Sequence, residues 1–346
     1  MKNTTAKWAG RFARLAIFAI LVAWLAQRLD VATLREVGRN AMRQPLWISG
    51  GVLFMLLTSF AAALRWRGLL GTQGVVLPTS AIMRIFFIGQ FFNSFMLGAC
   101  GGDMVRIYYV LRGTTARRTE AATTVLIDRG IGICVQILLG CLLILVNWAL
   151  FRAHATLQTA ALLMFSCGAG TALLVGALLW KNLFEHFALF RRLEQATPLG
   201  ARFRRAYEEL LRYRQRPRAL MSAFFFSILN LLFQVIATAS LGRSLGLHAA
   251  FGDYLVFLPI ISVLTAIPLT PGSFGVREGL FVLLFQAVGV SAHHAVLLSL
   301  LFYAAALVWS LVGGLVFLGH SAGAGFNWRE ELARIRQSGD ENSVTP

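Results

Sequence analysis

The chain has 346 residues, of which 57% are hydrophobic and only 14% are charged. Soluble domains usually carry about 25% charged residues, so this composition excludes an ordinary soluble protein and indicates an all-α integral membrane protein. Lys and Arg outnumber Asp and Glu by 32 to 15, which gives a formal net charge of +17. The basic residues stand between apolar segments, where they orient the chain in the membrane, so we expect no nucleic-acid partner.

Six apolar runs are predicted to cross the bilayer, because about 20 apolar residues in one helix span a hydrocarbon core of about 30 Å. A basic segment at 1–11 precedes them, the transmembrane domain extends over residues 12–320, and a short polar tail follows at 321–346. The second run closes with Arg65-Trp66-Arg67, a combination typical of an anchor at the membrane surface. The six runs are residues 12–26, 46–64, 121–150, 158–180, 219–241 and 293–319.

Two further apolar segments, residues 81–104 and about 252–290, are broken by glycine and proline and carry charges. Backbone breaks and charges at membrane depth are tolerated only where they face protein or a water-filled cavity. A hairpin that enters and leaves by one face of the membrane satisfies this condition. We therefore expect two re-entrant hairpins of broken helices. The residues predicted to form the backbone breaks are Gly101, Gly102, Pro271, Gly272, Gly275 and Gly279.

The basic loops predict how the chain is oriented in the membrane. Residues 181–218, residues 106–118 and the N-terminus are all rich in arginine or lysine, which favours the cytoplasmic side for each. This requires the first hairpin to enter from the cytoplasm and the second from outside, and it places both termini in the cytoplasm. The loop at 28–43 disagrees, because its four arginines would lie outside.

The two halves of the chain, about 12–150 and 158–319, follow the same order of span, polar loop, span, broken hairpin and span. The break at 98–106 is also similar to that at 271–279. With three crossings per half, the second copy would be inverted, which is a transporter architecture with its binding site where the breaks meet. The alternative, a chance likeness of two short Gly-rich strings, remains open from the sequence.

Arg106 and Arg277 follow the two breaks and are the main candidates for binding a substrate. An arginine in a membrane segment normally has a partner or a function, and guanidinium groups bind phosphate with two parallel hydrogen bonds. One hypothesis is that both arginines hold a lipid phosphate, oriented by Asp103 and Glu278. The other is that each arginine merely neutralises a neighbouring acid.

Three more residues belong to the candidate set. Asp128 and Arg129 are adjacent in the expected span at residues 121–150, where Asp128 either takes part in proton transfer or is the counter-ion of Arg129. Asn93, before the first break, either touches the ligand or joins helices by a hydrogen bond. Four cysteines lie in apolar segments without metal-ligand spacing, and no nucleotide-binding or catalytic motif is recognisable. We expect no metal, no cofactor and no enzymatic activity.

These motifs resemble a known family. Asn93 followed by the Gly-rich break and Gly-Gly-Asp-x-x-Arg106, the pair Asp128-Arg129, and the string Pro271-Gly-Ser-Phe-Gly-Val-Arg-Glu-Gly279 are similar to the flippase-like family. This family is the transmembrane region of lysylphosphatidylglycerol synthases and its stand-alone relatives. The resemblance covers about residues 10–320. One departure is Ala99-Cys100, where the family's first break often has proline.

The resemblance implies movement of a lipid or lipid-linked sugar between the leaflets of a bacterial inner membrane. Only about 26 residues follow the last span, so the soluble aminoacyl-transferase domain of the bifunctional members is expected to be absent. We therefore expect a flippase-like transporter of an anionic or polyprenyl-phosphate-linked lipid. The alternatives are an accessory subunit, which binds lipid and docks a glycosyltransferase or synthase through residues 181–218, and an integral-membrane transferase.

Overall fold

The computed structural model describes residues 43–95, 101–113, 118–179, 216–266 and 275–323, together with Arg39 and Ser273. Every element found in this part of the chain is a helix, which confirms the all-α prediction. The elements are α3 (Pro45–Thr72), α4 (Thr79–Phe95), α5 (Gly101–Gly113), α6 (Arg118–Val146), α7 (Trp148–Ala153), α8 (Ala155–Leu179), α12 (Pro217–Ser244), α13 (Phe251–Thr265), α14 (Val276–Phe285), the 3₁₀ helix η2 (Gln286–Val288) and α15 (Ala292–Gly323).

Within the described residues, five helices are long and apolar enough to cross a membrane: 45–72, 120–146, 155–177, 217–244 and 292–319. They correspond to five of the six expected spans, and the expected span at 12–26 lies outside the described residues. The second expected span is longer than predicted, because α3 continues to Thr72. The surface-anchor interpretation of Arg65 and Trp66 was therefore wrong: both are buried, and only Arg67 of the three is exposed.

The two interrupted segments each form a pair of short helices. Helices α4 and α5 have 17 and 13 residues, and α13 and α14 have 15 and 10. At 1.5 Å per residue none of the four reaches 30 Å. In the first pair Asn93 contacts Gly102 and Phe86 contacts Arg106. In the second, Tyr254 near the start of α13 contacts Phe285 at the end of α14, and Thr265 contacts Ser273 next to the break. The partners of each pair are thus antiparallel, as in a helical hairpin.

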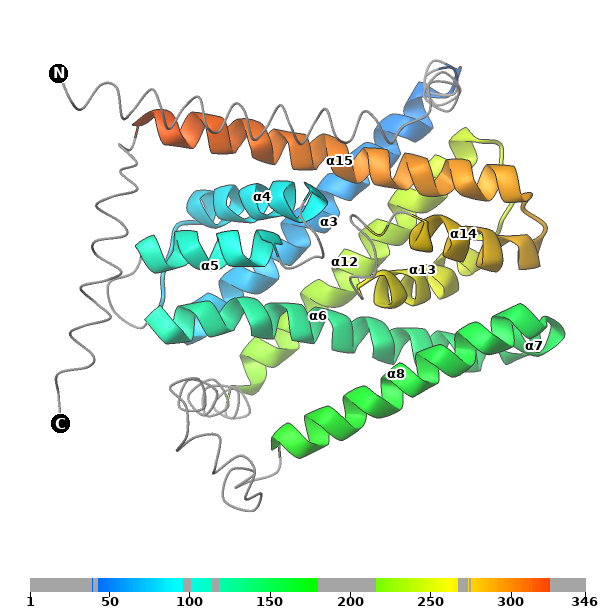
Figure 1. Ribbon diagram of the computed structural model, residues 1–346, viewed down its shortest axis with the longest axis horizontal. Coiled ribbons are helices and arrows are strands. Elements are labelled where there is room, and N and C mark those ends of the chain that lie inside the picture. The colour runs from blue at the N-terminus through cyan, green and yellow to red at the C-terminus, as the bar shows by residue number, and fades with distance from the viewer. Residues whose placement is uncertain are drawn as a thin grey trace.

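Helices α3 and α12 run antiparallel through the middle of the molecule (Figure 1). Both have 28 residues and both begin with proline, which suits the first turn of a helix because it needs no N–H there. Both are followed by a glycine of positive φ, Gly74 and Gly246, which ends the helix. Their sequences therefore set the same length and the same boundaries.

The remaining helices enclose the two hairpins. Figure 1 shows α4 and α5 at one end of the molecule and α13 and α14 at the other, with the ends next to the breaks facing the middle. Helix α15 packs against α4 and α14, and α6 packs against α5 and α13. The largest apolar core surrounds the second hairpin, where Phe281 stacks on Phe285 and Tyr254 and Phe257 cover the same ring.

Candidate functional site

A buried group of charged side chains joins α3, α5 and α6. Asp128 of α6 lies at its centre and is almost completely buried. One carboxylate oxygen accepts a hydrogen bond of 2.8 Å from Nε of Arg65, and the other accepts one of 3.0 Å from Arg106. Arg65 also donates a hydrogen bond of 3.0 Å to the hydroxyl of Ser227 on α12. Four helices therefore meet at one carboxylate.

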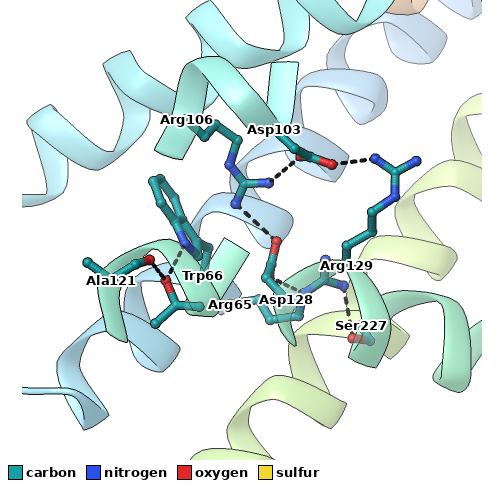
Figure 2. A network of polar contacts seen from close by, with 9 residues as sticks. Arg65, Trp66, Asp103, Arg106, Ala121, Asp128, Arg129 and Ser227 are labelled. Carbon is teal, nitrogen blue, oxygen red and sulfur yellow. Dashed lines mark hydrogen bonds and ion pairs between the residues drawn. The ribbon is translucent and has the colours of Figure 1, made fainter. Parts of the chain in front are cut away.

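A second carboxylate extends this group. Figure 2 shows Arg106 and Arg129 approaching Asp103 from opposite sides. Arg106 lies 3.4 Å from Asp103, and Arg129 forms an ion pair with the other oxygen of the same carboxylate. Among the described residues, three guanidinium groups thus face two carboxylates. We call Arg65, Asp103, Arg106, Asp128 and Arg129 the arginine network.

Aromatic rings hold the central arginine of the network. The guanidinium carbon of Arg106 lies 4.2 Å from the centre of the Trp66 ring and 4.9 Å from that of Phe86. Rings at this distance attract a cation electrostatically. Trp66 is itself fixed, because its indole N–H donates a hydrogen bond of 3.2 Å to Thr124 (Figure 2). Nε of Arg106 is buried and makes no hydrogen bond within the described part of the chain.

A second, smaller group lies at the start of α14. Arg277 donates a hydrogen bond of 2.9 Å to Glu278 and one of 3.3 Å to the hydroxyl of Ser299 on α15. Its guanidinium carbon lies 4.4 Å from the centre of the Tyr303 ring. The hydroxyl of Tyr303 in turn donates a hydrogen bond of 3.4 Å to the carbonyl of Ser94, near the end of α4. Tyr303 therefore connects this group with the first hairpin.

Glu278 also stabilises the beginning of α14. Its second carboxylate oxygen accepts a hydrogen bond of 2.5 Å from the backbone N–H of Gly275. Gly275 has a φ of +83°, a conformation in which glycine is favoured because it has no Cβ. An acidic side chain in the first turn is favourable at the positive end of the helix dipole. Asp103 occupies the equivalent third position of α5.

Comparison with known proteins identifies the family. The family model described as the lysylphosphatidylglycerol synthase TM region matches residues 11–314, which include both groups of charged residues. The chain belongs to this family. A relative is the UPF0104 membrane protein PH1989 of Pyrococcus horikoshii, which is 24% identical over 274 residues, 72% of this chain and 79% of the relative. The expected resemblance is confirmed, and the chain is a multi-pass membrane protein.

In this member of the synthase transmembrane-region family, the two expected arginines lie in different groups. Arg106 belongs to the arginine network, whereas Arg277 contacts Glu278, Ser299 and Tyr303. Asp103 and Glu278 are adjacent to these two arginines, as expected. The pairing of Asp128 differs from expectation, because its partners are Arg65 and Arg106 while Arg129 pairs with Asp103.

The remaining candidate residues are Asn93 and those expected to form the backbone breaks. Asn93 accepts a hydrogen bond of 2.8 Å from the backbone N–H of Gly102 and so joins the two helices of the first hairpin. Gly101 and Gly102 are the first two residues of α5, next to the break. Gly279 lies within α14 rather than at the break. Pro271 and Gly272 lie outside the described residues.

Sequence reasoning missed Arg65, Ser227 and Tyr303. Arg65 could have been found from the sequence, because it directly follows the expected span at 46–64. Extending that span by a few residues places Arg65 inside the membrane helix. No local pattern marks Ser227 or Tyr303, whose partners lie on distant helices. Among the described residues, no group of three or more His, Cys, Asp or Glu is arranged to hold a metal ion.

Proposed function

We propose that this chain moves an anionic phospholipid or a polyprenyl-phosphate-linked lipid between membrane leaflets, with arginines at the two broken helices holding the lipid phosphate. The observation that carries the proposal is the buried arginine network at the start of α5, in which three arginines gather around two carboxylates among the described residues. A charge buried in a membrane protein is costly and normally marks a functional site. A phosphate group could take the place of a carboxylate as partner of these guanidinium groups.

The three arginines of the network differ in how much of each side chain is exposed. The side chain of Arg129 is 27% exposed, against 7% for Arg106 and 9% for Arg65. We infer that the phosphate first meets Arg129, in competition with Asp103, and that Arg106 and Arg65 supply the deeper positive charge. Guanidinium groups suit this role because they present paired N–H donors to phosphate. The start of α5 adds backbone N–H groups and the positive end of its dipole.

The proposal includes an inverted repeat of two halves, supported by equivalent residues that are 172 positions apart. This offset relates Pro45 to Pro217, which begin α3 and α12, and Thr58 to Asn230, which are joined by a hydrogen bond. To within one residue, it also relates Phe87 to Pro259 and Gly140 to Gly313. Gly313 of α15 lies against Phe87 of α4, while Gly140 of α6 lies against Pro259 of α13. The last helix of each half thus packs on the hairpin of the other half.

The packing of each half's last helix on the other half's hairpin suggests how the two halves would move. The arginine network lies between α5 and α6, and the Arg277 group lies between α14 and α15, so each group connects a hairpin with the last helix of its own half. The contacts with the other half's hairpin include the close approaches at Gly313 and Gly140 and the hydrogen bond from Tyr303 to Ser94. In the proposed mechanism, one half rocks against the other about α3 and α12 and exposes each group in turn. As a transporter, the chain would carry out no catalytic step.

The proposal places both hairpins as re-entrant, both termini in the cytoplasm and a sixth span at 12–26, in a bacterial inner membrane. Cysteine labelling from each side of the membrane tests it, with Cys100, Cys134, Cys141 and Cys167 replaced by serine. Arg112→Cys and Arg216→Cys should react only from the cytoplasm, and His248→Cys and His293→Cys only from outside; all four native positions are exposed. Reaction at position 112 from outside would show that the first hairpin is a crossing.

Transport itself is tested with the purified chain in vesicles that contain a fluorescent phosphatidylglycerol, by measuring how much of it a membrane-impermeant quencher reaches over time. Arg106→Lys, Arg277→Ala and Arg277→Lys should lose transport, since lysine keeps the charge but not the paired donors. Arg84→Ala, which changes an exposed arginine on α4, should retain it. Full transport by either Arg277 variant, in a protein that elutes as the wild type does, would refute the role of that arginine.

The accessory-subunit alternative makes a different prediction for the same preparation. The purified chain alone would not move lipid, and removal of residues 190–216 would abolish co-purification of a glycosyltransferase or synthase. Residues 181–215 lie outside the described part of the chain, so no contact described here favours that function.

A further inference from the structure

A groove lies at one end of α3, separate from both groups of charged residues. It has a volume of about 370 Å³ and is bounded by the last turns of α3, the start of α4 and the first turns of α12. Arg67 lines it, two residues from Arg65 of the arginine network. Two residues correspond to about 200° around a helix, so these two arginines point to opposite sides of α3. The groove is therefore not an extension of the network.

The groove has an apolar floor and a positive charge. Phe226 and Ile82 form part of the floor, and Val76 at its edge is 86% exposed. Arg67 is the one charged side chain among the described residues that line it, and the hydroxyl of Ser222 is there as well. The described residues that line the groove include no acidic side chain, in contrast to the arginine network, in which every arginine has a carboxylate partner.

More positive charge lies close by at the start of α12. Arg216 donates a hydrogen bond to the carbonyl of Thr72, the last residue of α3, which fixes this arginine at the same end of the molecule as the groove. Arg218, in the first turn of α12, is exposed. Each basic residue near a membrane surface contributes about 1 kcal/mol to the attraction of anionic lipids.

The depth of Arg67 suits a lipid headgroup. The midpoint of α3 is near Thr58, and nine residues separate Thr58 from Arg67, so the arginine lies about 13 Å along the helix from the midpoint. The hydrocarbon core extends about 15 Å from its centre. Arg67 is thus near the boundary between the core and the headgroups, with the apolar floor beside it.

We propose that this groove binds one anionic phospholipid, whose phosphate contacts Arg67 and Ser222 and one of whose acyl chains covers the apolar floor. A free phosphate ion would leave that floor uncovered, and a zwitterionic lipid carries a cationic group beside its phosphate, which weakens its attraction to Arg67, Arg216 and Arg218. The site is distinct from the proposed transport site, and its occupancy does not depend on whether the chain moves lipid.

Photo-crosslinking of the full chain in vesicles tests the site. The probes are phosphatidylglycerol and phosphatidylcholine that carry the same photoreactive group on one acyl chain, and the labelled peptides are identified by mass spectrometry. Phosphatidylglycerol should label residues 64–82 and 222–226 about fivefold more than phosphatidylcholine does, the preference expected from one basic residue. Equal labelling of these segments by the two probes would overturn the proposal.

Two substitutions separate the headgroup contact from the acyl contact. Arg67→Gln should lower labelling by phosphatidylglycerol more than labelling by phosphatidylcholine and so reduce the preference. Gly71→Phe should lower labelling by both probes, because a Cβ at Gly71 has no atom within 4 Å and the ring would fill the groove. Gly176→Phe on α8, where the Cβ position is equally open, should change neither. An undiminished preference in Arg67→Gln, or undiminished labelling in Gly71→Phe, would contradict the proposed contacts.

Discussion

The side-chain amide of Asn230 donates a hydrogen bond of 2.8 Å to the backbone carbonyl of Thr58. The two residues are at the midpoints of α12 and α3, so this bond joins the two antiparallel helices at their centres. On either side of it the contacts mirror one another, with Gly50 near Ser240 towards one end and Gly68 near Ser222 towards the other. The other helices are arranged around this pair.

Replacing Asn230 by alanine should lower the free energy of unfolding by about 0.5 to 1.5 kcal/mol, the range found for hydrogen bonds between membrane helices. The measurement is an unfolding titration of the purified protein in mixed micelles. Asn147→Ala is the matched control, because the Asn147 amide donates to Leu143, four residues earlier at the end of α6, and that local bond can persist when helices separate. Equal losses in the two variants would show that the bond between α12 and α3 adds nothing.

Replacing Asp128 by asparagine should be far more damaging, with a loss of about 3 to 5 kcal/mol, because Arg65 and Arg106 would remain buried without their shared carboxylate. The same titration measures this loss. The double variant Asp128→Asn with Arg65→Gln should recover part of it, since one uncompensated charge is then removed. Glu120→Gln, in the first turn of the same helix, is a control that should change stability little. Strictly additive losses in the double variant would argue against direct coupling.

Gly102→Ala should destabilise the first hairpin, because a Cβ at this position would overlap the carbonyl oxygen of Gly89 on α4. Forced repacking of this kind costs about 1 to 3 kcal/mol. Gly279→Ala is its counterpart in α14, where nothing lies within 4 Å of the added Cβ, and it should be neutral or stabilising by up to about 1 kcal/mol. Thermal unfolding in detergent compares the two. A neutral Gly102→Ala would mean that α4 and α5 do not approach as closely as described.

Tyr303→Phe and Tyr303→Leu should separate two contributions of this side chain. Phenylalanine keeps a ring near Arg277 and removes the hydrogen bond of 3.4 Å to Ser94, so the loss should be about 1 kcal/mol. Leucine also removes the ring, which should cost about 1 to 2 kcal/mol more. The unfolding titration gives both values, and a double-mutant cycle of Tyr303→Leu with Arg277→Leu gives the coupling. No coupling in that cycle would exclude an attraction between ring and cation.

The positions of helices were largely predictable from the sequence. Apolar length alone located five spans, since crossing the hydrocarbon core requires a minimum number of apolar residues. The interrupted segments were recognised because glycine and proline next to charged residues are incompatible with a simple crossing. Boundaries were less accurate, and α3 was ended too early, because Arg65-Trp66-Arg67 was taken as a surface anchor although two of its three side chains are buried.

The charged pairs also fall into two groups, those that the sequence predicts and those that depend on the tertiary structure. By itself the sequence determined the contact of Arg106 with Asp103, because residues three positions apart lie on the same face of a helix. Arg277 and Glu278 are adjacent in the chain, which keeps them near one another, although neighbouring side chains in a helix do not share a face. Only the tertiary structure decided that Asp128 binds Arg65 and Arg106 while Arg129 turns to Asp103, and that Tyr303 connects Arg277 with Ser94. Those partners are on different helices, and which of them meet depends on the crossing points of α3, α5, α6 and α15, which no local pattern encodes.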